Sequence, residues 1–189
     1  MTTNADPFHT HLERGIREAL SRISSAETPD IYVVSLFVYD ENDDPAKPTV
    51  TVGYNTEQAV ADTTPQAWDE GEARWNYAFW LQNELSVLAD SGLDPVGASL
   101  RDDWTFRVDG DDAGNIPDES PPITWRFVEL LIDIVRELHA DGTISRVFGQ
   151  SIPVLIHELE YYDLIAAQNR QANPDGLADA FCAWVLDDD

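Results

Sequence analysis

Apolar residues recur at helical spacing near the start of the chain and again in its second half. Between Pro7 and Ser25 they fall every three or four positions, with arginines and glutamates mostly on the other side. Asp6 is suited to cap this helix and Pro7 to begin it. The segment 123–139 is apolar on most sides, which predicts a largely buried helix ended by Gly142. We expect further helices at 67–89, 160–171 and 175–186.

Other segments have the composition of strands. Ile31 to Asp40 is β-branched and aromatic throughout, which predicts a strand covered on both faces. A turn cluster follows, and Pro48 to Tyr54 alternates as a second strand, so the two form a hairpin. Ile152 to Ile156 is a third strand, which Pro153 restricts to a sheet edge or a strand start. The segment 101–110 is expected to hold a short strand around Trp104.

These elements predict one α+β domain spanning residues 1–189. Its sheet is small and mixed or antiparallel, made of the hairpin at 31–54 and a strand near 152–156, and it packs with about five helices. A length of 189 residues suits a single hydrophobic core. Residues 109–122 are rich in glycine, aspartate and proline, and we expect a flexible loop there.

The charge of the chain is strongly one-sided. It has 36 Asp and Glu against 11 Lys and Arg, a net charge of −25. This excludes ordinary electrostatic binding to nucleic acid and argues against docking on anionic lipid. The apolar runs are too short to span a membrane, and the N-terminus shows no signal-peptide pattern. The single cysteine, Cys182, is predicted to be a buried hydrophobe and fits a reducing compartment, so we predict a cytoplasmic protein.

Catalytic and metal-binding patterns begin in two places and are not completed. His157 and Glu158 start a zinc-protease motif, but Tyr161 stands where the second histidine belongs. Asp40 starts an EF-hand pattern, but Pro45 takes the position of the required glycine. Only tertiary contacts could assemble a site from the four histidines. We therefore predict no catalytic residues, no cofactor and no metal, and do not expect an enzyme.

Aromatic and acidic residues provide the candidate contacts with a partner. The predicted helix at 67–89 carries more rings than one core-facing stripe takes up, so Arg74, Trp75 and Trp80 are candidate interaction residues. Packing of these rings into the core is the alternative. An acidic stretch adds five further candidates, which are Asp102, Asp103, Asp109, Asp111 and Asp112.

Several short motifs, in order, resemble an uncharacterised bacterial family catalogued as a domain of unknown function. The motifs are the aromatic strand at 31–36, Asn55-Thr56-Glu57, Arg74-Trp75 with Trp80, the strand at 152–156, Asn173-Pro174, and a terminal helix with Phe181 and Trp184. The resemblance implies a compact α+β fold and no established activity. Small acidic families of this type are often immunity proteins encoded beside bacterial toxins. This inference is an analogy with families of similar size and charge.

Three hypotheses about function follow from these observations. The first is a cytosolic acidic interaction module, immunity-like or inhibitor-like, that binds a basic protein partner. The second is a domain of other function whose acidity is an adaptation to salt. The third is a nucleic-acid mimic whose aspartates imitate phosphates. The pattern favours the first, and it predicts neither the partner's identity nor an oligomeric state.

Overall fold

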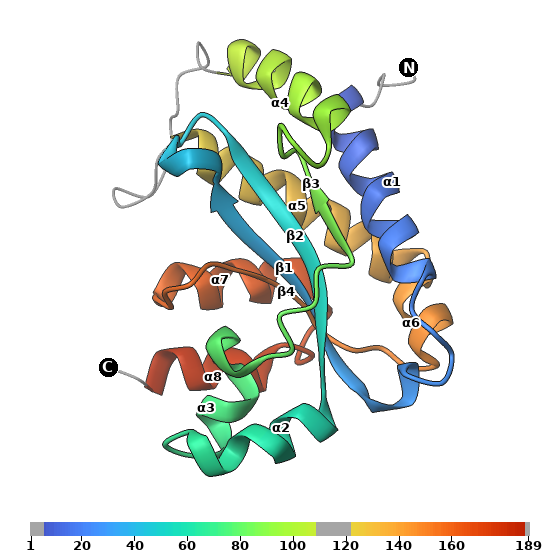
Figure 1. The fold of residues 1–189 in the computed structure, drawn as a ribbon, viewed down its shortest axis with the longest axis vertical. Helices are drawn as coiled ribbons and strands as arrows, with labels where there is room; N and C mark the ends of the chain where they lie inside the picture. The colour runs from blue at the N-terminus through green and yellow to red at the C-terminus, as the bar shows by residue number, and fades with distance from the viewer. Residues whose placement is uncertain (1–5, 109–121, 188–189) are drawn as a thin grey trace.

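A mixed sheet of four strands runs through the middle of the molecule, with helices on both faces (Figure 1). The computed structural model describes residues 6–108 and 122–187. The strand order is β3-β2-β1-β4. The strands are β1 (Ile31–Asp40), β2 (Pro48–Thr56), β3 (Ser86–Leu88) and β4 (Val154–His157). This confirms the α+β fold with a small mixed sheet.

The predicted hairpin forms the centre of the sheet. β1 and β2 are antiparallel, with Leu36 opposite Val52, and a short 3-10 helix at Glu41–Asp43 joins them. β4 lies parallel to β1, with Val34 beside Val154. β4 is an edge strand that begins directly after Pro153, which agrees with the position expected for this proline.

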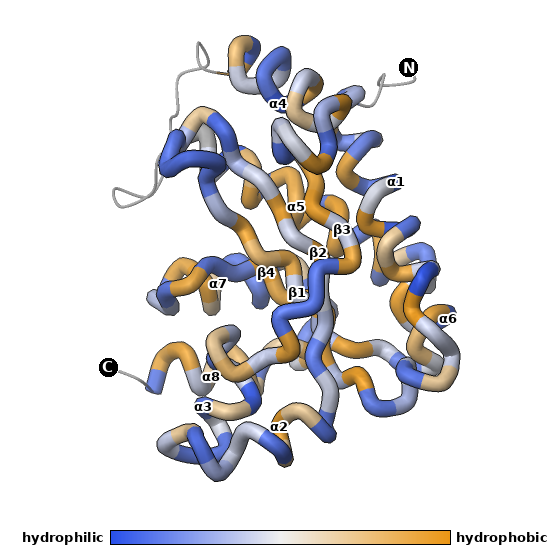
Figure 2. The backbone as a smooth tube through the Cα atoms, viewed as in Figure 1, coloured by the Kyte–Doolittle hydropathy of each residue, from blue (hydrophilic) through white to orange (hydrophobic). Residues whose placement is uncertain are grey.

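One face of the sheet is covered by α1 (Pro7–Ser21), α4 (Pro95–Val108), α5 (Pro122–Ala140) and α6 (Thr143–Phe148). The Asp6 side chain caps α1 by accepting a hydrogen bond from the Phe8 backbone N–H at 2.8 Å, as predicted. α1 ends at Ser21, four residues earlier than expected. Hydrophobic residues of these helices meet one face of β1 and β2, and Figure 2 shows this apolar character along α5 and the neighbouring strands.

The opposite face is covered by α3 (Glu70–Trp75), α7 (Asp163–Ala172) and α8 (Asp179–Asp187). α2 (Glu57–Thr63) packs beside α3. Val33 and Leu155 point into this second core, because alternate residues of a strand face opposite sides. Cys182 is buried here, as predicted, and its thiol donates a hydrogen bond to the Ala166 carbonyl at 3.3 Å.

The outer edge of β4 is paired by a side chain of α7 and by that of its C-cap residue, Asn173, in place of a fifth strand. The Asn173 amide accepts from the Val154 N–H at 2.8 Å and donates to the Val154 carbonyl at 2.9 Å. One helical turn earlier, Asn169 makes the same two contacts with Ile156, both at 2.8 Å. An open strand edge invites pairing with other chains. The two asparagines close this one.

The prediction of one helix over residues 67–89 is wrong. α3 stops at Trp75, because Asn76 adopts an extended backbone and its side chain caps a following 3-10 turn at Tyr77–Phe79. The chain then reaches β3, where Val87 lies opposite Thr51. Pairing with the hairpin and burial of the rings outweigh helical periodicity in this segment.

The strand predicted at 101–110 is also wrong, because its described part belongs to α4. Trp104 is buried from a helical position and lies 5.5 Å from the Phe8 ring, measured between ring centroids. Asp94 caps this helix by accepting from the Gly97 N–H at 3.0 Å. The loop expected at 109–122 falls almost wholly outside the described residues.

Candidate functional site

Two of the three candidate aromatic and arginine contacts lie in the core. Trp75 is 8% exposed and Trp80 is 5% exposed. The Trp80 indole N–H donates to the Arg74 carbonyl at 2.8 Å, which satisfies the one polar atom of the ring. The alternative, core packing, therefore describes these rings, and they offer a partner little surface.

Arg74 is held within the fold. Its guanidinium donates two hydrogen bonds to the Glu57 carboxylate, at 3.0 and 2.6 Å, and lies 4.6 Å from the centre of the Tyr32 ring. This fork-like contact and the stacking fix the arginine between α2 and β1. Arg74 therefore joins two elements of the molecule.

The predicted acidic stretch is described only in part. Asp102 and Asp103 are exposed on α4, and the Asp102 carboxylate accepts from Arg101 at 2.9 Å. Asp109, Asp111 and Asp112 lie outside the described residues. The structure thus leaves Asp103 and the exposed part of Asp102 as described candidates in this stretch.

Trp68 is an exposed aromatic residue that the sequence did not single out as a site. Its side chain is 94% exposed, and it stands directly before Asp69, which caps α3 by accepting from the Glu72 N–H at 2.8 Å. The Trp68 backbone N–H donates to the Glu72 carboxylate. The backbone is thus held by hydrogen bonds while the ring points away from the core. Polar neighbours and Pro65 were the signal for a turn here.

Acidic side chains accompany Trp68 at this end of the molecule. α2 and α3 pack together at the foot of the view in Figure 1. Their exposed acids are Glu57, Asp62, Asp69 and Glu70. Arg74 is the only cationic residue between positions 57 and 75, and Glu57 already pairs with it. We call Trp68 with these four acids the Trp68 surface.

A serine and a histidine form a buried pair between β1 and β4. The His157 Nδ1–H donates to the Glu158 carbonyl at 3.1 Å, since a carbonyl only accepts. Nε2 is therefore the acceptor, and the Ser35 hydroxyl donates to it at 2.8 Å. Such a relay resembles an activated nucleophile. Here His157 is 0% exposed and Ser35 is 2% exposed, so the hydroxyl is not accessible to a substrate in this conformation.

Aromatic rings surround this pair. Tyr77 lies 4.9 Å and Trp80 lies 5.4 Å from the His157 ring, measured between centroids. Burial lowers the pKa of His157 to about 4, so the imidazole is neutral at pH 7 and a weak base. Its partner, Ser35, came from a strand 122 residues away.

Two carboxyl groups lie close to the carboxyl ends of the same strands. Burial raises the pKa of Asp40 at the end of β1, and a hydrogen bond from Thr124 opposes that rise. Burial likewise raises the pKa of Glu158, which follows β4, and the negative charge of Asp40 adds to the effect. The Glu158 carboxylate also accepts a hydrogen bond from the Tyr162 hydroxyl at 3.3 Å, which opposes the rise in its pKa.

A second polar cluster lies beside the edge strand β3. His11 Nε2 and the Asp94 carboxylate are 2.8 Å apart, and Arg14 approaches His11 Nδ1 at 3.1 Å. These residues line a cavity of about 180 Å³ between α1 and β3. Although burial raises the pKa of Asp94, hydrogen bonds from Ala89, His11 and Gly97 lower it overall. Asp94 also caps α4, so the cluster has a structural role that explains its geometry.

No protein-family model, curated protein or solved structure matches this chain. The resemblance to an uncharacterised bacterial family therefore stays a prediction. Within residues 6–108 and 122–187, no helix has the length and apolar character needed to cross a membrane.

Proposed function

We propose that this chain is a cytosolic acidic interaction module that binds a basic protein partner, in the manner of an immunity protein or inhibitor. The observation that carries the proposal is the 94% exposure of Trp68 among carboxylates. An exposed tryptophan costs solvation free energy in the unbound chain, and tryptophan is enriched among residues that dominate binding. The acids around it favour a cationic partner.

The pairing of the cationic side chains also supports binding of a basic partner. Eight of the eleven form ion pairs with acids that the structure describes, and these are Arg14, Arg17, Lys47, Arg74, Arg101, Arg107, Arg126 and Arg136. Few cations are therefore left to offset the acidic surface. A field of this sign speeds the approach of a basic protein and weakens with added salt.

Trp68→Ala and a matched control test the proposal. Phe106, 86% exposed on α4 at the other end of the view in Figure 1, provides the control Phe106→Ala. Titration calorimetry would use a set of small basic proteins and arginine-rich peptides, at about 50 mM and about 500 mM salt. We expect binding at low salt that Trp68→Ala weakens at least about tenfold and Phe106→Ala less than about twofold.

The contribution of charge is tested by removing one carboxylate at a time. Glu70→Gln changes the Trp68 surface, and Glu160→Gln removes the same charge from an exposed position elsewhere. Glu70→Gln should slow association more than Glu160→Gln, because a charge near the contact steers approach most strongly. The proposal is refuted if no basic probe binds at low salt, or if binding is equally strong without the Trp68 ring.

A further inference from the structure

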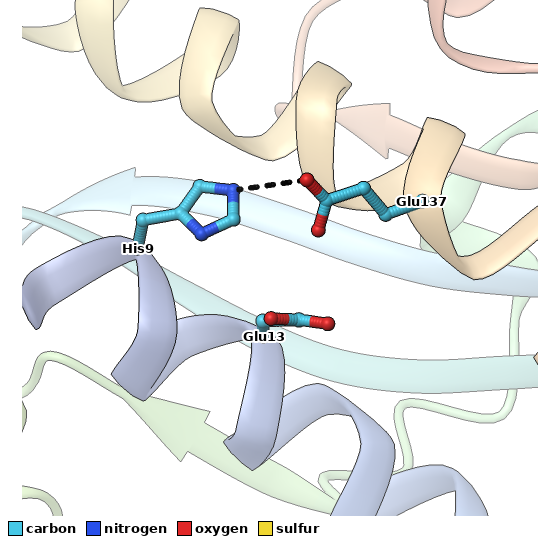
Figure 3. Close-up of side chains that lie close together, drawn as sticks. All are labelled: His9, Glu13 and Glu137. Atoms are coloured by element: carbon cyan, nitrogen blue, oxygen red, sulfur yellow. Dashed lines mark ion pairs between the residues drawn. The ribbon is translucent and has the colours of Figure 1, made fainter. Parts of the chain in front are cut away.

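Three potential metal ligands converge between α1 and α5. His9 and Glu13 lie one helical turn apart on α1, and Glu137 lies on α5. One donor atom from each side chain lies within 4.8 Å of the other two. Figure 3 shows the His9 imidazole and the Glu137 carboxylate facing each other across the gap, with Glu13 on the same side of α1. From the sequence, a metal site that includes a histidine was expected only if tertiary contacts assembled it.

The contacts around these side chains leave donor atoms available. His9 Nε2 and Glu137 Oε1 are 4.0 Å apart, which is too far for a hydrogen bond. Among the described residues, no hydrogen bond engages the His9 ring or the Glu137 carboxylate. Glu13 uses only Oε1 to accept two hydrogen bonds from Arg17, at 2.9 and 2.7 Å, so Oε2 stays available.

The distance between His9 Nε2 and Glu137 Oε1 is close to the separation of two ligands on one metal ion. Zinc–nitrogen and zinc–oxygen bonds of about 2.1 Å place neighbouring tetrahedral ligands about 3.4 Å apart. Closing the gap from 4.0 Å therefore needs a movement of about 0.6 Å, which rotation of the long Glu137 side chain supplies. Glu137 is 52% exposed and has room to move.

We propose that His9, Glu13 and Glu137 bind one divalent transition-metal ion, of which Zn²⁺ is the representative. Imidazole is a ligand for Zn²⁺ and other first-row transition-metal ions, whereas Mg²⁺ and Ca²⁺ take oxygen ligands. Three protein ligands leave the fourth position to water. The positive charge of Arg17, held on Glu13, opposes the ion, so we expect a micromolar dissociation constant. The ion would link α1 to α5 on the same face of the sheet.

Calorimetry with ZnCl₂ on the metal-stripped full chain tests the site, in a large excess of MgCl₂ that occupies unspecific carboxylates. We expect one Zn²⁺ per chain, with affinity lowered at least tenfold by His9→Ala and by Glu137→Gln. Two control variants each remove a side chain of the same type from a position outside the site. His11→Ala removes the neighbouring histidine, and Glu129→Gln removes a partly exposed acid from α5.

The controls should bind Zn²⁺ within about twofold of the unaltered chain. Far-ultraviolet circular dichroism confirms that each variant is folded. Absence of Zn²⁺ binding overturns the proposal, and so does binding that His9→Ala leaves unchanged, because the ion would then sit on other carboxylates. The Trp68 surface takes no part in this site, so the two proposals stand or fall separately.

Discussion

Replacing Arg101 by methionine is expected to destabilise the fold strongly. The Arg101 side chain is 0% exposed, and its guanidinium donates to the Glu41 carboxylate at 2.9 Å and to the Ala89 carbonyl at 2.6 Å. Methionine keeps the apolar stem and removes the charge and the donors. Breaking a buried ion pair from one side costs about 3–5 kcal/mol. Glu41 is 15% exposed and reaches some water, so we expect the lower value, about 3 kcal/mol.

Urea unfolding followed by circular dichroism measures this loss. With a slope of about 2 kcal/mol per molar urea, 3 kcal/mol lowers the midpoint by about 1.5 M. Arg107→Met is the matched control, because Arg107 is also on α4 and pairs with Asp6 but is 53% exposed. It should shift the midpoint by less than about 0.5 M. Equal shifts in the two variants would refute the reasoning.

A double variant separates the lost pair from the lost packing. Arg101→Met together with Glu41→Met replaces both charges by apolar groups. Much of the stability should return, because no buried carboxylate is then left without its cation. If the double variant is as unstable as the sum of the two single ones, the ion pair is not the cause.

Four further predictions concern the core, the sheet edge and the surface charge. His157 takes up a proton near pH 6.5 in the unfolded state and only near pH 4 in the folded state. The free energy of unfolding should therefore fall by about 2 kcal/mol from pH 8 to pH 5. His157→Asn should remove that part of the loss. Asn173→Ala leaves the Val154 amide and carbonyl unpaired and should cost about 2 kcal/mol or more in urea unfolding. Gln171→Ala, at an exposed position near the end of α7, should cost little. Because Cys182 is 0% exposed and burial also raises the pKa of its thiol, a thiol reagent should label it only as fast as the chain unfolds in part. Rapid labelling of the native chain would contradict this. Raising KCl from about 10 mM to about 500 mM should increase the melting temperature by several degrees, because it screens a net charge of −25, and a flat response would count against salt adaptation.

The sequence predicted most accurately the elements whose periodicity is strong and local. The helix beginning at Pro7, the hairpin and the helix at 123–139 all form, with ends that differ by a few residues or less. Their caps and turns are encoded by neighbours in sequence, such as Asp6 and Gly142, so no distant contact is needed to place them.

The segments 67–89 and 101–108 were misassigned because distant contacts override local pattern there. Trp75 and Trp80 pack against the sheet and Val87 pairs with the hairpin, so the chain between them leaves the helix. Trp104 is buried against Phe8 of α1 from within a helix, although its neighbours are typical of a strand. Burial of large rings is worth more free energy than a few residues of propensity.

The sequence alone determined the fold class, the acidity and the burial of Cys182, because composition and periodicity are properties of the chain itself. Only the tertiary structure decided which rings are buried. It placed Trp75 and Trp80 in the core and left Trp68 outside, although all three stand within thirteen positions. It also brought His9 and Glu137 together and paired Ser35 with His157, since proximity of residues more than a hundred positions apart depends on packing and leaves no trace in local spacing.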